Sequence, residues 1–123
     1  MRNECYGDQQ INGDLLKKIK SGQLIKGYHG TSSGNAKKIE DGGFENHTCI
    51  EGQTGVWFWD SDVQQNASYN GTQKARKTGD KGYAIIEAEL TKPQPDIKGR
   101  KQWLSSASCA TVTKVSYFNL EDN

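Results

Sequence analysis

The chain has 123 residues, a length that suffices for one compact domain and is too short for two. We therefore predict a single domain over residues 1–123. Its 16 basic and 15 acidic side chains nearly cancel, which excludes the strongly basic surface typical of duplex or membrane binding. No stretch has the length of a membrane span, and the N-terminal segment lacks the apolar centre of a signal peptide. We expect a cytoplasmic protein, or one delivered into a target cell's cytosol without a conventional signal peptide.

The first predicted elements are a helix, a strand and a second helix. Residues 12–22 have apolar side chains at helical spacing between an Asn or Asp N-cap and a terminal glycine. Residues 23–30, QLIKGYHG, form a predicted strand, so His29 lies where a strand ends. Residues 32–42 are predicted to be a capped helix, after which Phe44 returns to the core. We expect residues 45–54 to be a loop over the site.

The second half of the chain is predicted to contain strands and one more helix. An aromatic strand, GVWFW at residues 55–59, precedes a helix at residues 61–70 that carries Tyr69 near its end. We expect the glycine-rich, basic residues 71–82 to form a surface loop. Residues 83–90 and 110–118 are predicted strands, whereas the prolines in TKPQPDIKG exclude a central strand between them.

The three cysteines, Cys5, Cys49 and Cys109, are odd in number and lack the paired spacing of a zinc site. We therefore predict buried thiols, with neither a disulfide framework nor a metal site. Trp57 and Trp59 share one strand face, where a core position is expected. Trp103 stands in a polar context that suits the lining of a groove.

The stretch YHGTSSG, residues 28–34, combines a histidine at a strand end with a small, flexible turn. A histidine next to Gly30 offers a ring donor or acceptor beside backbone groups that no Cβ obstructs. Such an arrangement suits a ligand with ribose hydroxyls and a carboxamide. The alternative is a histidine whose hydrogen bonds are satisfied within a tight turn.

Three ordered motifs extend this pattern: GYHGT followed by an Ala/Ile helix and GGF, then GVWFW with ASYN, then GYAIIEAEL. Together, from about Leu24 to Leu90, they resemble the catalytic core of ADP-ribosyltransferases of the H-Y-E type. This group includes diphtheria-toxin-like toxins and the catalytic domain of poly-ADP-ribose polymerases. The resemblance implies an α+β fold with a split β-sheet, short flanking helices and a central cleft that binds NAD as co-substrate.

The resemblance also implies roles for individual residues. His29 would hydrogen-bond the adenosine ribose, and Gly30 would meet the nicotinamide amide through its backbone, with Thr31 or Ser32 supporting the turn. Tyr69 would stack on the nicotinamide ring. The opposite wall would be Trp57, which stands where the family often has a tyrosine. Tyr28 and Phe58 are the alternative candidates for the role of Tyr69. This account requires the side chains of His29 and Tyr69 to converge on one cleft.

The family's third motif, a glutamate at the start of a late strand, is absent. This carboxylate holds the ribose 2′-hydroxyl and stabilises the positive charge that develops as the nicotinamide bond breaks. The late strand here, SCATVTKVSYF, contains no acid, and Ala110 occupies the position expected to carry Glu. Either the sequence is an inactivated variant, or it is a natural pseudoenzyme with Ser108 or Thr111 near that position. A third explanation assigns the role to Glu87 or Glu89.

The leading functional hypothesis is a mono-ADP-ribosyltransferase that modifies a macromolecular acceptor as a toxin, effector or phage-type modifier. The near-neutral charge favours a protein acceptor over nucleic acid, although the KARK run at residues 74–77 leaves RNA or DNA open. We expect a monomer without membrane contact, and the resemblance implies a neutralising immunity or antitoxin protein. The first alternative is a non-catalytic module that binds NAD, ADP-ribose or a partner. The second is a lectin-like or structural domain built around the tryptophans.

Overall fold

The computed structural model describes residues 11–48 and 53–120, so Cys5 and Cys49 lie outside the described residues. The helices are α1 (Gly13–Ser21), α2 (Ser33–Gly42) and α3 (Gln65–Thr78), with short 3₁₀ turns η2 (Ser61–Val63) and η3 (Ala107–Cys109). The strands are β1 (Ile25–Ser32), β2 (His47–Thr48), β3 (Thr54–Asp60), β4 (Gly82–Leu90), β5 (Gln94–Pro95), β6 (Gln102–Ser105) and β7 (Ala110–Asn119). This confirms the predicted α+β class. None of the described helices combines the length and apolar character that a membrane crossing needs.

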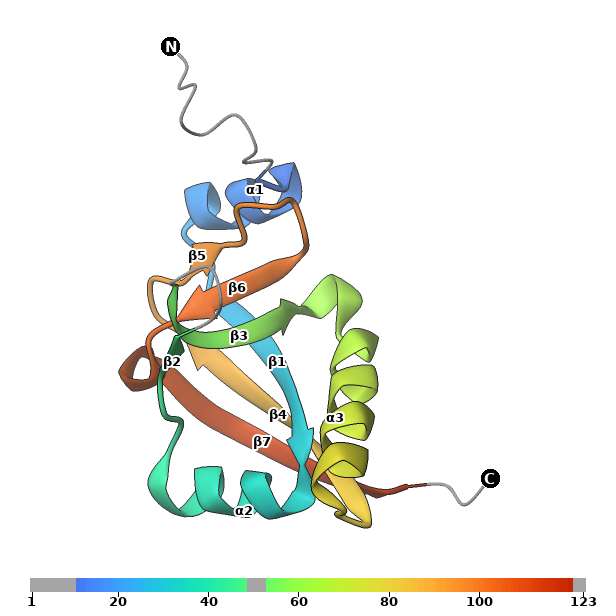
Figure 1. The fold of residues 1–123 in the computed structure, drawn as a ribbon. Helices are drawn as coiled ribbons and strands as arrows, with labels where there is room; N and C mark the ends of the chain where they lie inside the picture. The colour runs from blue at the N-terminus through green and yellow to red at the C-terminus, as the bar shows by residue number, and fades with distance from the viewer. Residues whose placement is uncertain (1–10, 49–52, 121–123) are drawn as a thin grey trace.

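The sheet is antiparallel and consists of two halves that meet at one corner. Its order is β5-β6-β3-β1-β4-β7, and the short strand β2 pairs with the start of β3. β1 and β3 share only the pairs Gly27–Asp60 and Tyr28–Trp59, whereas β1 pairs with β4 along its whole length. Figure 1 shows β3 and β6 crossing obliquely over the other half. No described strand therefore pairs with the outer edge of β1 from residue 29 to residue 32.

Helices α2 and α3 cover opposite faces of the half formed by β1, β4 and β7. Alternate residues of β4 are buried on one face, where Ala84 and Ile86 pack against Ala36 and Ile39 of α2. Helix α3 lies on the other face, and Gly30 of β1 approaches its backbone closely. A Cβ on Gly30 would lie 1.8 Å from the carbonyl oxygen of Ala67. This position therefore requires glycine.

The main hydrophobic core lies at the other end of the sheet, beneath α1. It consists of Leu15, Ile25, Val56, Phe58, Ala88, Leu90 and Trp103. Trp103 is fully buried, so the expectation that it lines a groove is wrong. The reason is its place on β6, where it pairs with Phe58 of β3 and its indole Nε1 donates to Asp60 at 2.9 Å.

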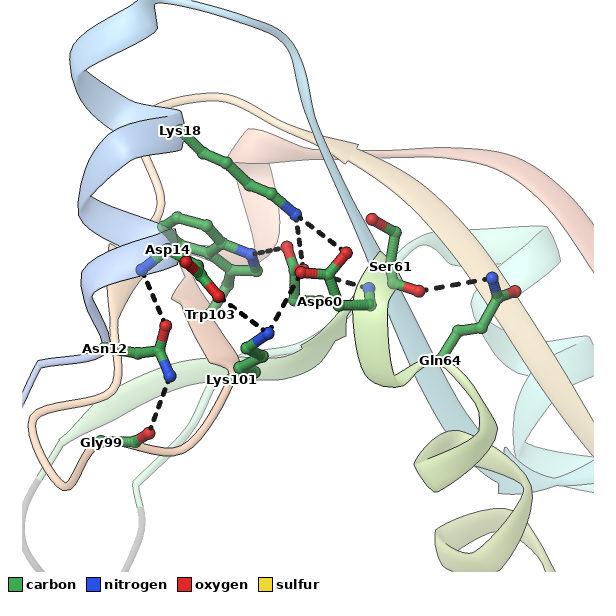
Figure 2. Close-up of polar contacts among 10 residues, drawn as sticks. Asn12, Asp14, Lys18, Asp60, Ser61, Gln64, Gly99, Lys101 and Trp103 are labelled. Carbon is green, nitrogen blue, oxygen red and sulfur yellow. Dashed lines mark hydrogen bonds and ion pairs between the residues drawn. The ribbon is translucent and has the colours of Figure 1, made fainter.

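A buried ion pair closes this end of the fold. The Asp60 carboxylate is 1% exposed and accepts hydrogen bonds from Lys18 Nζ at 2.6 Å, from the Trp103 indole and from the backbone of Asp62. Figure 2 shows these side chains converging from α1, β3 and β6. Burial opposes ionisation, but the hydrogen bonds from Lys18 and Trp103 hold the pKa of Asp60 below its usual value. The cluster joins three elements that are distant in sequence.

Most predicted helices and strands are found, but two predicted loops contain regular structure. Helix α3 continues to Thr78 through the expected loop, because Gly71 packs against Tyr83 and Ala75 is buried. Within the expected loop at residues 45–54, His47 and Thr48 form strand β2 beside β3. β6 was not predicted. Cys109 is a free thiol that is only half-buried, so the prediction of a buried thiol is wrong for this cysteine.

Candidate functional site

His29 lies at the corner where the two sheet halves separate. Its ring faces the same side of β1 as Ile86 of β4, its register partner. The Nδ1–H group donates a hydrogen bond to the backbone carbonyl of Trp57 on β3, with 2.9 Å between the heavy atoms. Phe44 and Phe58 contact the ring with centroid separations of 5.4 and 5.7 Å. The imidazole thus spans the opening between β1 and β3.

This environment fixes the protonation state of His29. Burial, reinforced by the charge of Lys74, lowers the pKa of the imidazole from 6.5 to about 4, against the opposing effect of the Trp57 hydrogen bond. The ring is therefore neutral at pH 7. Because a carbonyl only accepts, Nδ1 carries the proton and Nε2 is a hydrogen-bond acceptor. Among the described residues, Nε2 has no hydrogen-bond partner.

Three cavities share His29 as a wall. The largest, about 550 Å³, lies between α2 and α3 along the outer edge of β1. A second, about 190 Å³, lies toward Phe44, His47 and Val56. The third, about 90 Å³, is lined by Gly30, Trp57, Trp59, Asn70, Lys74 and Gln102. The largest has a volume typical of small-molecule sites.

The largest cavity is lined on its β1 and α2 side by a network of hydrogen-bonding side chains. Ser32 caps α2 by accepting from the backbone of Asn35 at 3.2 Å. The Asn35 amide in turn donates to the Thr31 hydroxyl at 2.8 Å. Thr31 and Ser32 are both buried, and they hold the start of α2 against the edge of β1. The expected turn directly after His29 is absent, because β1 continues through Thr31 to Ser32 and α2 begins only after it.

Three lysines line the same cavity: Lys38 from α2, and Lys74 and Lys77 from α3. None of them forms an ion pair within the described part of the chain. Nearby protein atoms partly desolvate the Lys74 amine, which lowers its pKa. The one acid in this lining, Asp80, accepts from the backbone of Gly34 at 3.1 Å. The cavity therefore presents unpaired positive charge next to a neutral imidazole.

The two tryptophans of β3 lie on the cavity side of that strand. Both are half-buried, so the expected core position is wrong: Val56 and Phe58, on the opposite face of β3, point into the core instead. The Trp59 indole donates to the side-chain oxygen of Asn70 on α3 at 2.6 Å. Trp57 therefore reaches the His29 region, whereas Phe58 contacts His29 from the core and does not line any of the three cavities.

The structure does not bring Tyr69 to His29. Its side chain is 67% exposed and lines none of the cavities that His29 lines. The reason is the register of α3. Ala67 and Gly71 face the sheet, so the residue midway between them points to solvent. Asn70 lines the smallest of the cavities in its place.

Tyr28 and Glu87 lie on the opposite face of the sheet from His29. They are register partners on β1 and β4, and both line a separate cavity of about 250 Å³ beneath α3. Burial opposes ionisation of Glu87, but hydrogen bonds from Tyr28 and Thr113 keep its pKa below the usual value. Glu89 follows on the same face. The strand alternation therefore separates both acids from His29.

Ala110 lies at the start of β7, next to a different cavity. It pairs with Leu90, and Leu90 pairs with Ile25, four residues from His29 on β1. Strand spacings place its Cα about 16 Å from that of His29. Ser108 lines the cavity of Ala110, and Thr111 is exposed on β7. None of these residues joins His29.

Several residues of the site had no signal in the sequence. Lys38 follows Asn35 by three residues, which places both on one helix face once the bounds of α2 are known. Asn70 and Lys74 lie on α3, whose second half was expected to be a loop. Gln102 lies on the unpredicted strand β6. Glu45 follows Phe44 and lines the 190 Å³ cavity with His29.

The residues around His29 match the ribose and pyrophosphate of NAD better than its nicotinamide ring. The 550 Å³ cavity offers hydroxyl, amide and ammonium groups that match a ribose and a pyrophosphate. The cavity beside Gly30 is the smallest of the three that His29 lines, about 90 Å³, and α3 covers the side of Gly30 on which a Cβ would lie. No group of metal-ligating side chains occurs among residues 11–48 and 53–120. No family model, curated protein or solved structure was found to match the chain.

Proposed function

We propose that this chain is a module that binds an ADP-ribose-containing nucleotide, NAD or ADP-ribose itself, without cleaving it. The observation that carries the proposal is the position of His29. Its neutral ring has an unpartnered Nε2, and His29 lines a 550 Å³ cavity together with three lysines that form no ion pairs within the described residues. A hydrogen-bond acceptor next to unpaired cations is complementary to a hydroxyl next to phosphates.

In this proposal the chain's own residues have separate tasks. Nε2 of His29 accepts a hydrogen bond from a ribose hydroxyl. Lys38 and Lys74, which face the cavity from opposite sides, bind the pyrophosphate. Asn35, held by its bond to Thr31, contributes its side-chain carbonyl to a further hydroxyl. The family resemblance in the sequence supports the same class of ligand.

The absence of cleavage is proposed from the positions of the acids. Breaking the bond between nicotinamide and ribose requires a carboxylate that faces the charge developing on the ribose. Ala110 has no carboxylate and lies about 16 Å from His29 by strand spacing. Glu87 lies on the other face of the sheet. These positions support the proposal that the chain binds the nucleotide without cleaving it.

The test is isothermal titration with NAD and ADP-ribose, in parallel with an assay of nicotinamide release. The proposal predicts one-site binding of both nucleotides and no release above background. His29→Phe, which removes the acceptor, should weaken binding about fivefold or more, and Lys38→Gln should weaken it similarly. Lys20→Gln on α1 is the matched control and should leave affinity unchanged. Absence of binding by the unmodified chain would reject the proposal.

A second candidate function is NAD-dependent mono-ADP-ribosyl transfer to a macromolecule, probed by the same assay. The observation that favours it is Glu45, an acidic residue that lines the 190 Å³ cavity together with His29. In such a transfer the glycosidic bond to nicotinamide breaks and an acceptor nucleophile bonds to the ribose carbon. Release of nicotinamide that disappears in Glu45→Gln but persists in Glu40→Gln would establish this function over the binding module.

A further inference from the structure

The run KARK at residues 74–77 lies on the second half of α3, where it joins an exposed aromatic ring. Tyr69 and Arg76 are seven residues apart, so they lie on one face of the helix, two turns from each other. Gln73 and Lys77 border them, and all four side chains are exposed. We call Tyr69, Gln73, Arg76 and Lys77 the outer face of α3. It faces away from the sheet and continues into the 550 Å³ cavity through Lys77.

The charge of this helix is uncompensated. Helix α3 contains no acidic residue, and Lys74, Arg76 and Lys77 form no ion pair within the described part of the chain. Lys74 and Lys77 are three residues apart, a spacing at which like charges repel on a helix surface. By contrast, Lys18, Lys26 and Lys101 elsewhere in the fold each pair with a carboxylate.

The helix dipole explains part of this pattern and leaves part of it unexplained. Cations in the last turn stabilise a helix, which accounts for Arg76 and Lys77. It does not account for Lys74, which faces the cavity one turn earlier, or for an aromatic ring left in solvent. The whole chain has a net charge of only +1, so these cations are concentrated on one surface against a net acidic remainder.

We infer that the outer face of α3, together with Lys74, binds single-stranded nucleic acid. Ammonium and guanidinium groups on successive turns suit the phosphates of an extended polyanion, and an exposed tyrosine offers a stacking surface for an unpaired base. A single nucleotide in the cavity leaves Tyr69 and Arg76 without contact, because both point away from it. The inference goes beyond the proposed function. Only the idea that a nucleic acid bound at α3 is also a partner of the nucleotide site rests on the proposed function.

Fluorescence anisotropy with labelled single-stranded DNA and RNA of about 15 nucleotides tests this inference, since a footprint of this order is typical of single-strand sites. Neutralising about three phosphates predicts that log Kobs falls with log salt at a slope near −2. The triple variant Lys74→Gln, Arg76→Gln, Lys77→Gln should weaken binding tenfold or more and flatten that slope. Tyr69→Ala should weaken binding about fivefold or more with the slope unchanged.

The matched control is Lys17→Gln with Lys20→Gln on α1, both exposed in the structure, and it should bind like the unmodified chain. Circular dichroism verifies that each variant folds. Equal binding by the triple variant, or equally tight binding of a polyglutamate peptide, would overturn the inference. A chain that binds ADP-ribose but no oligonucleotide overturns this inference alone, and the reverse result overturns the proposed function alone.

Discussion

The imidazole of His29 donates from Nδ1 to the backbone carbonyl of Trp57 across the corner where two sheet halves separate, at 2.9 Å. This bond sets the tautomer and leaves Nε2 as an acceptor at a cavity wall. One side chain therefore joins β1 to β3 and presents the group on which the proposed nucleotide site depends. Its contribution to stability and its contribution to binding can be measured separately.

The first prediction concerns pH and stability. Burial lowers the pKa of His29 to about 4 in the folded chain, whereas the unfolded value is near 6.5. The unfolded chain binds the proton more readily, so the stabilisation is complete above pH 6.5 and is lost as pH falls toward 4. Between pH 7 and pH 4.5 the free energy of unfolding should fall by about 2.5 kcal/mol more than it does in His29→Gln.

Urea denaturation of both proteins at the two pH values measures this difference. Carboxylates titrate in both proteins, so the comparison isolates the histidine. Equal pH dependence in the two proteins would show that the folded chain does not lower the pKa of His29.

The second prediction concerns the contact between β1 and α3. Gly30→Ala places a methyl group 1.8 Å from the carbonyl oxygen of Ala67, and this backbone cannot move without displacing α3. The expected cost is about 3 kcal/mol or more of unfolding free energy. Gly42→Ala is the control, because nothing lies within 4 Å of its added methyl and the free energy should be unchanged or rise by up to about 1 kcal/mol. Equal thermal stability of the two variants would contradict this packing.

The third prediction concerns the buried carboxylate of Asp60. Asp60→Ala leaves the Trp103 indole and the Lys18 ammonium without their acceptor, so about 3–5 kcal/mol of stability should be lost. Asp62→Ala removes exposed ion pairs with Lys18 and Lys101 and should cost less than about 1 kcal/mol. Urea unfolding followed by tryptophan fluorescence compares them. A loss in Asp60→Ala no larger than in Asp62→Ala is the contrary outcome.

The fourth prediction concerns Ala110. From the sequence alone, Ala110→Glu would be expected to restore cleavage of NAD. The register of β7, however, places residue 110 beside a different cavity from those that His29 lines. Ala110→Glu should therefore leave nicotinamide release at background and nucleotide affinity within about twofold. The assay uses purified protein with NAD. Appearance of nicotinamide release in this variant would return the inactivated-enzyme hypothesis to first place.

Elements set by local patterns were predictable from the sequence. Asn12 caps α1 and Gly22 ends it in the left-handed conformation, as the cap residues indicate. The alternation in β4 likewise matches its burial. The prolines at residues 93 and 95 limit β5 to two residues at the edge of the sheet.

Features that depend on packing between distant segments were not predictable. The glycines and lysines of residues 71–79 are typical of a loop, yet contacts of Gly71 with Tyr83 keep this stretch helical. That register turns Tyr69 outward and brings Asn70 to the cavity lined by Trp57 and Gly30. Strand β6 exists through its pairing with β3, which no local pattern indicates. His29 was predicted to end a strand, but β1 continues to Ser32; what ends next to His29 is the pairing of β1 with β3.

The most direct measurement of the central claim is the ¹⁵N spectrum of the histidine side chains during titration with ADP-ribose at pH 7. The chain has two histidines, so a His47→Gln variant assigns the signals. The account predicts a His29 ring protonated at Nδ1 only, with an Nε2 resonance that shifts as the ribose hydroxyl bonds to it. An Nε2 resonance of His29 that stays unchanged at saturating ADP-ribose would contradict the account.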